Sequence, residues 1–184
     1  MQARDISPDY EFDYKSAKLI KKILKRSEDG NGIQAFVECK KKLNDYSYWF
    51  VLGTLWVDST DGANISLWKS LFSSSRPNRD SSLMKPSELR FFKKLPAEIT
   101  VYRAKRKAEE DWIAYTLDPS VAGKMAISRA TDVVHEYKVK KRDVDAIFLR
   151  RGESEVLVLD NLKPTLVRTI DVKIKGEIGY VEVL

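Results

Sequence analysis

The sequence predicts an α+β protein in which a helical N-terminal half precedes a half rich in β-strands. Before Leu95, apolar residues recur at the three- and four-residue spacing of one helical face. After Pro96 they form short β-branched or alternating runs, separated by polar turns. The 184 residues suit one domain, and the 43% hydrophobic content supports a sizeable core. We therefore expect helices over residues 1–92 to pack on a β-rich core over residues 93–184.

Apolar periodicity predicts four helices in the N-terminal half, at residues 14–25, 33–43, 46–57 and 67–72. The aromatic-rich segment 46–57 fits either a buried helix or two short strands, and its length favours the helix. Cys39 is expected to pack in the core, because no histidine lies near it in the sequence. The polar run 73–82 predicts a linker to the second half.

The second half is predicted to contain seven short strands, at residues 99–102, 112–116, 133–139, 146–148, 156–159, 166–172 and 179–184. One helix interrupts them. It begins with Pro119 in its first turn and with Asp118 as its N-cap.

Composition excludes several classes of site and partner. One cysteine and one histidine leave neither an internal disulfide nor the Cys- or His-rich cluster of a common metal site, so we expect no metal. The N-terminus has no signal-peptide pattern, and no apolar run reaches the ~18 residues of a spanning helix. These observations predict a soluble, cytoplasmic protein that does not act on membranes.

Net charge favours an anionic partner. Lys and Arg number 33 against 27 Asp and Glu, giving a net charge of +6 and a pI near 9.2. Basic residues cluster at 21–26 and 138–142, but no nucleic-acid motif accompanies them and most such clusters are solvated faces. Nucleic acid therefore stays open as a partner without a motif to support it.

Three places carry side chains suited to a ligand. Arg103 ends a predicted strand, where its guanidinium either grips phosphate oxygens or belongs to an exposed basic hairpin. Thr116 precedes a helix N-terminus, which either faces an anion or is simply capped. Glu153 and Glu155 share a face if their strand begins at the glutamates. Such paired carboxylates occur on a wet surface or at a site that uses them.

Taken in chain order, four segments resemble the motifs of ADP-ribosyltransferases of the arginine–serine–glutamate type, especially small bacterial and phage proteins. They are Tyr102-Arg103, residues 114–119 with Val121-Ala122, residues 143–148 and residues 151–156. The resemblance implies a mostly antiparallel, split β-sheet. In that sheet a Tyr-Arg-Gly strand, a Ser-Trp-Thr strand and a Glu-x-Glu strand build one NAD cleft. Ala104 stands where the family favours glycine, Ala114 where it has the serine, and Tyr115 where it has tryptophan.

The resemblance also implies roles for individual residues. Arg103 would hold the phosphates or ribose of NAD, and Ala104, Tyr115 and Thr116 would complete the NAD-binding strands. Glu155 would be the catalytic glutamate, because a carboxylate hydrogen-bonded to the ribose stabilises oxocarbenium-like charge. We expect these three strands to bring Arg103, Thr116 and Glu155 into one cleft.

Glu153 would orient or activate an arginine acceptor. The implied function is transfer of ADP-ribose from NAD to a side chain, by preference arginine, of a host or cellular protein, with release of nicotinamide. Such an enzyme would be a toxin-like bacterial or phage effector acting in the cytoplasm, including that of a host cell. Two other readings stay open. One is an NAD glycohydrolase with water as acceptor, and the other is an inactive basic binding module on the same fold.

Overall fold

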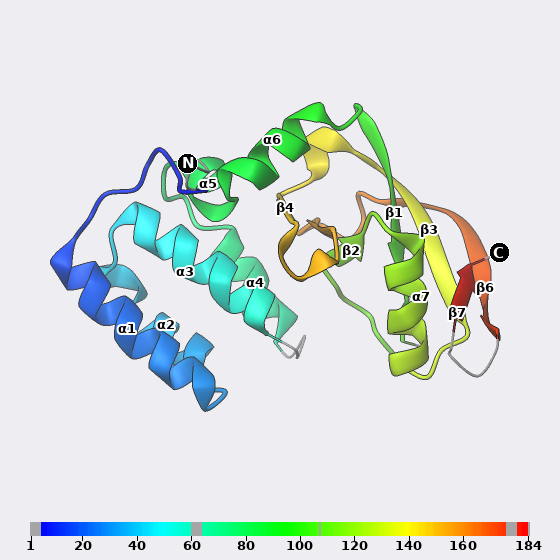
Figure 1. Ribbon diagram of the computed structural model, residues 1–184, viewed down its shortest axis with the longest axis horizontal. Coiled ribbons are helices and arrows are strands. Elements are labelled where there is room, and N and C mark those ends of the chain that lie inside the picture. The colour runs from blue at the N-terminus through cyan, green and yellow to red at the C-terminus, as the bar shows by residue number, and fades with distance from the viewer. Residues whose placement is uncertain (1–4, 60–63, 107, 176–179, 184) are drawn as a thin grey trace. The chain divides into compact units, whose positions relative to one another are not determined.

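The computed structural model describes residues 5–59, 64–106, 108–175 and 180–183. The chain divides into two compact units, residues 1–91 and residues 92–184. The first unit is helical and the second contains the β-sheet, so the chain is α+β, as predicted (Figure 1).

The helical unit contains α1 (Tyr14–Glu28), α2 (Gly32–Cys39), a 3-10 turn (Lys40–Lys42), α3 (Asp45–Asp58), α4 (Ile65–Phe72) and α5 (Arg79–Leu83). Helix α6 (Pro86–Lys94) crosses the boundary between the units. The carboxylate of Asp13 accepts the Ser16 amide at 2.7 Å and so caps α1. The four predicted helices are confirmed, whereas α5 and α6 were not predicted.

Helix α3 forms the centre of this unit. Trp49 and Leu52 are fully buried, and a helix that is apolar on every side is found inside a core. Edge-to-face packing of Trp56 on Trp68, with ring centroids 5.0 Å apart, joins α3 to α4. Cys39 is 6% exposed and packs in the same core, as expected.

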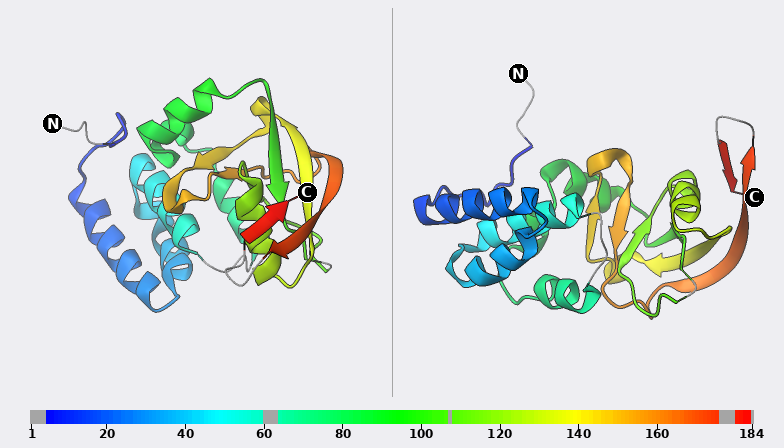
Figure 2. Two further views of the ribbon diagram at one scale, coloured as in Figure 1. Left: turned by 45° about the vertical axis from the view of Figure 1, so that its right-hand side comes forward. Right: turned by 90° about the horizontal axis from the view of Figure 1, so that it is seen from below.

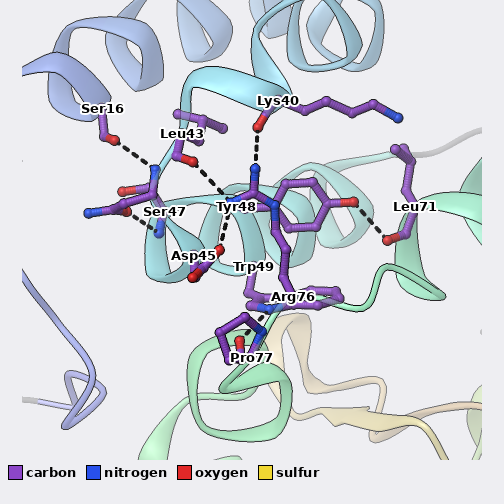
Figure 3. Close-up of polar contacts among 11 residues, drawn as sticks. Ser16, Lys40, Leu43, Asp45, Ser47, Tyr48, Trp49, Leu71, Arg76 and Pro77 are labelled. Atoms are coloured by element: carbon purple, nitrogen blue, oxygen red, sulfur yellow. Dashed lines mark hydrogen bonds and ion pairs between the residues drawn. The ribbon is translucent and has the colours of Figure 1, made fainter.

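Residues 73–82 do not form the predicted linker. The Arg76 guanidinium donates hydrogen bonds of 3.0 Å to the carbonyls of Lys40 and Leu43 (Figure 3). It also binds the Asp45 carboxylate at 2.7 Å, which ties the segment to the start of α3 (Figure 3). The segment then forms α5. Its polar composition serves these long-range contacts, which local sequence patterns do not reveal.

In its described residues the second unit contains seven strands: β1 (Glu98–Arg103), β2 (Ala114–Thr116), β3 (Val133–Lys140), β4 (Ala146–Phe148), β5 (Glu155–Leu157), β6 (Thr165–Lys175) and β7 (Tyr180–Val183). Their order is β4-β5-β2-β1-β3-β6-β7, and each ladder is antiparallel. Short 3-10 turns cover Lys141–Asp143 and Arg150–Gly152. The predicted strands are confirmed over the described residues, while residues 179 and 184 of the last one lie outside them.

Helix α7 (Pro119–Ser128) follows β2 and lies against strands β1 and β3 (Figures 1 and 2). Asp118 caps it by accepting the Ser120 amide at 2.8 Å, as predicted. Four small buried side chains form the contact between helix and sheet, namely Ala104, Ala122, Ala126 and Val134. Small side chains at this contact let the helix approach the sheet closely.

Pairing in the sheet is weakest between β1 and β2. Strand β1 forms six registered pairs with β3, from Glu98 opposite Lys140 to Arg103 opposite His135. It forms a single pair with β2, Tyr102 opposite Thr116. The sheet therefore consists of a ladder β4-β5-β2 and a ladder β1-β3-β6-β7, joined at one point.

Candidate functional site

The three strands that carry the sequence motifs are neighbours in the sheet. Tyr102 on β1 lies opposite Thr116 on β2, and Thr116 lies opposite Glu155 on β5. Residues directly opposite one another in antiparallel strands project from the same face. The structure thus aligns Tyr102, Thr116 and Glu155 in one row on the face of the sheet that α7 partly covers.

The hydroxyl of Thr116 holds the turn that contains the glutamates. Thr116 is 3% exposed. Its Oγ1 donates to the carbonyl of Glu153 at 2.6 Å and accepts the amide of Asp118 at 3.0 Å. The next amide, that of Leu117, donates to the carbonyl of Ser154 at 3.0 Å. Thr116 therefore connects the start of α7 to the turn before β5, and its hydroxyl is engaged within the protein.

The turn before β5 has an unusual backbone. Arg151, Gly152 and Ser154 have φ angles of 65°, 73° and 45°. For the two residues with a side chain this left-handed region is unfavourable, by an amount on the order of 1–2 kcal/mol each. Such conformations persist only where surrounding contacts impose them. The hydrogen bonds that the carbonyls of Glu153 and Ser154 accept are contacts of this kind.

The turn also separates the two glutamates. Strand β5 begins at Glu155, whereas Glu153 has φ −88° and ψ −10°, which is helical backbone. The strand does not include Glu153, so the condition under which both side chains would share one face of a strand is not met. Both residues are partly exposed, Glu155 at the first position of β5 and Glu153 at the end of the preceding 3-10 turn. Two carboxylates with different backbone settings are suited to different tasks.

Arg103 does not share the face of Thr116 and Glu155. It follows Tyr102 in β1, and successive side chains of a strand point to opposite faces. Its guanidinium is buried, at 6% exposure, and forms an ion pair with Glu109. The strands that carry Arg103, Thr116 and Glu155 are therefore adjacent, as expected. The prediction that the three side chains meet in one cleft is wrong, because Arg103 lies on the other face of the sheet.

Arg103 bridges the point where β1 and β2 part. Its Nη1 donates to the carbonyl of Ala114 at 2.5 Å. Arg103 is one residue beyond the registered partner Tyr102 on β1, and Ala114 is two residues beyond Thr116 on β2. The guanidinium carbon lies 5.5 Å from the centre of the Trp112 ring, in cation–π range. Burial lowers the pKa of Arg103, and the carboxylate of Glu109 opposes that effect. Among the described residues, its buried Nε has no hydrogen-bond partner.

Ala104 and Tyr115, both expected to contact NAD, are buried side chains. Tyr115 is 3% exposed, and its hydroxyl oxygen accepts the Trp112 indole N–H at 2.7 Å. Burial raises the pKa of the Tyr115 hydroxyl. Ala104 is 1% exposed and packs on α7, while its carbonyl accepts Nη1 of Arg129 at 2.5 Å. Both side chains are therefore packed inside the protein and are not presented to a ligand.

Sequence reasoning missed a pair of arginines beside this region. Arg106 and Arg129 line a cleft of about 700 Å³ together with Thr131 and Val172. Val172 packs against the cluster that contains Ala104. Ile127, in the last turn of α7, and residues 130–132, just after the helix, also line the cleft. Burial, followed by the positive charge of Arg103, lowers the pKa of Arg129. Neither arginine belongs to a motif of the resemblance. The available signals were the basic run 105–107 in the sequence, which contains Arg106 and was interpreted as an exposed hairpin, and the net positive charge.

Two further findings describe the chemistry of the chain. Over the residues described, no group of three or more His, Cys, Asp or Glu side chains is placed to hold a metal ion. None of the helices in the described ranges combines the length and apolar character needed to cross a bilayer.

Comparisons with family models, curated proteins and solved structures give no match.

Proposed function

We propose that the chain is a mono-ADP-ribosyltransferase that moves ADP-ribose from NAD to an acceptor side chain, by preference arginine, of a host or cellular protein. The proposal includes a split β-sheet of the ADP-ribosyltransferase type, and the single registered pair between β1 and β2 supports it. The resemblance in the sequence supplies the family, and the arrangement of the motif strands agrees with it.

One observation carries the proposal. The hydroxyl of Thr116, in the second motif strand, binds the backbone of Glu153 at 2.6 Å, and Thr116 lies opposite Glu155 in the sheet. Two segments that are 37 residues apart in the sequence thus fix the position of a glutamate pair. A glutamate pair on a solvated strand end needs no such buried connection.

The two carboxylates fit the two halves of the transfer. In the first, the bond between the nicotinamide nitrogen and C1′ of the ribose breaks, and its electron pair leaves with neutral nicotinamide. Positive charge then develops on the ribose, and the Glu155 carboxylate stabilises that charge. In the second, a nitrogen of the acceptor guanidinium forms a bond to C1′. Glu153 takes the proton that this nitrogen loses.

The structure favours a positioning role for Arg103. Its guanidinium already binds Glu109 and Ala114, and breaking a buried ion pair costs about 3–5 kcal/mol. Arg106 and Arg129 line an open cleft beside the C-terminal end of α7, and a guanidinium suits phosphate oxygens. We therefore assign the diphosphate of NAD to Arg106 and Arg129, and the shape of the β1–β2 junction to Arg103.

The test compares two isosteric variants under one assay. The protein is incubated with NAD labelled in the adenylate part and a cell lysate, and labelled protein, free ADP-ribose and nicotinamide are measured separately. Glu155→Gln keeps the shape of the side chain and removes the charge, so transfer and hydrolysis should both fall at least about a hundredfold, while NAD binding persists. Glu153→Gln should reduce transfer and leave part of the hydrolysis, because water needs no activated guanidinium.

Glu98→Gln is the matched control, because Glu98 is also the first residue of a strand and is exposed. It should leave all three signals unchanged. Free ADP-ribose without labelled protein would indicate an NAD glycohydrolase. If neither site variant changes any signal, the glutamates are a solvated strand end, and a binding module becomes the better interpretation.

A further inference from the structure

The helical unit contains an open apolar groove that the proposed activity does not use. Helices α1 and α3, with the segment leading into α1, surround a space of about 660 Å³. Ala17, Ile20 and Leu24 line it from successive turns of α1, and Phe50 lines it from α3. A groove floor built from two adjacent helices is the surface that an amphipathic helix recognises.

Large apolar side chains around this groove are exposed. Tyr10, Phe12 and Tyr14 are 53%, 69% and 75% exposed, and Leu24 and Phe50 are 37% and 36% exposed. Contiguous apolar surface of this kind is uncommon on a soluble monomer and marks an interaction site.

The groove is held in shape by its own aromatic residues. The Tyr10 ring packs edge-on against Tyr46 at 5.3 Å, and Tyr46 stacks on Phe50 at 5.7 Å. Such contacts stabilise an arrangement before any partner arrives.

Charge is distributed unevenly along the groove. Glu11 and Asp13 lie at the end where α1 begins, and Lys21 and Lys25 lie in later turns. Glu28, in the last turn, lies beyond the two lysines, so the complementary stretch covers residues 11–25. A second α1 running in the opposite direction would bring acidic residues against lysines at both ends.

We propose that a second copy of this chain closes the groove, with the two α1 helices antiparallel about a two-fold axis. A two-fold interface uses the same patch on both copies and must be self-complementary. The groove and the residues around it are self-complementary in charge, because the acidic and basic ends face each other in an antiparallel pair, and also in shape. Tyr10 and Phe12 line the groove and are exposed, so the groove can receive the same side chains from the other copy.

The size of the contact indicates a weak dimer. The 15 residues of α1 span ~22 Å. A strip of that length is at the small end of specific interfaces, which bury about 800 Å² on each partner. We therefore expect dissociation in the micromolar range.

Sedimentation velocity of the full chain from ~1 to ~100 μM tests the dimer over that range. Phe50→Asp should weaken association more than about tenfold, since it places a charge in the centre of the interface. Val37→Asp is its control, because Val37 is also 36% exposed and lies on α2 outside the groove lining.

Charge exchange tests the orientation. The double variant Lys21→Glu with Lys25→Glu should lose self-association, whereas Lys18→Glu with Lys22→Glu, which changes the charge of the same helix equally, should not. Mixing the first variant with Glu11→Lys should restore a mixed dimer. Each of these variants replaces exposed charged side chains, so the fold is expected to survive, and circular dichroism checks this.

Loss of the dimer in the groove variants alone, with recovery on mixing, supports the proposal. A chain that stays monomeric over the whole range overturns it, including a monomer whose groove binds a different protein. A dimer that all of these variants leave intact also overturns it, because the interface then lies elsewhere. None of these outcomes depends on NAD, so the proposal stands or falls separately from the enzymatic one.

Discussion

Thr116→Val removes one hydroxyl at the centre of the site and keeps the shape of the side chain. In the wild-type chain Oγ1 makes two hydrogen bonds, to the Glu153 carbonyl and from the Asp118 amide, at a position that is 3% exposed. Each contributes about 0.5–1.5 kcal/mol, and a buried partner left unsatisfied costs more. We therefore expect the free energy of unfolding to fall by about 2–3 kcal/mol.

Urea denaturation followed by circular dichroism measures this loss, and amide hydrogen exchange localises it. The Asp118 amide loses its acceptor, and the Leu117 amide loses a fixed partner in the turn, so both should exchange faster. Thr100→Val is the matched control on β1, because its partly exposed hydroxyl accepts one hydrogen bond, from Lys138 at 2.8 Å. It should change stability by less than about 0.5 kcal/mol. If Thr116→Val behaves like the control, the hydroxyl does not hold the turn.

Two further predictions concern the opposite face of the sheet. Glu109→Gln should lower the free energy of unfolding by about 2–4 kcal/mol, because it leaves the buried Arg103 charge without its carboxylate, whereas exposed Glu110→Gln should have little effect in the same titration. Burial, followed by the charge of Lys105, lowers the pKa of His135 below 6.5, so its single imidazole signal in an NMR titration should have a midpoint under that value. The unfolded chain then takes up this proton first as the pH falls, so His135 reduces stability progressively below about pH 6.5 and has no effect above it. A midpoint above 6.5 would contradict this account.

Local signals in the sequence were sufficient for most of the elements. Asp118 followed by Pro119 predicts the start of α7 because a cap and a first-turn proline act within one turn of helix. The prediction of a linker over residues 73–82 was wrong because the partners of Arg76 lie more than thirty residues away in the sequence. Polar composition looks the same in a free linker and in a segment that a partly buried guanidinium holds to a helix.

The site was predictable only in part, because successive side chains of a strand alternate between the two faces of the sheet. Motif order indicated that β1, β2 and β5 belong together, and the structure places them side by side. Which face a side chain takes depends on the strand register to a single residue. Tyr102, not Arg103, is opposite Thr116, and nothing in the local sequence distinguishes the two. The left-handed residues before β5 have no sequence signal either, because Arg151 and Ser154 are not typical of that region.

Burial of Arg103 follows from the way the sheet divides. Beyond the single β1–β2 pair, the two strands no longer pair through their backbone hydrogen bonds. Buried carbonyls without a hydrogen-bond donor are costly. Arginines take their place, since Arg103 donates to the carbonyl of Ala114 and Arg129 donates to that of Ala104. A ligand phosphate that recruited Arg103 would have to displace both Glu109 and a backbone carbonyl. Arg129 also lines an open cleft, and a guanidinium has five N–H donors, so an anion can approach it there while its hydrogen bond to the Ala104 carbonyl stays in place.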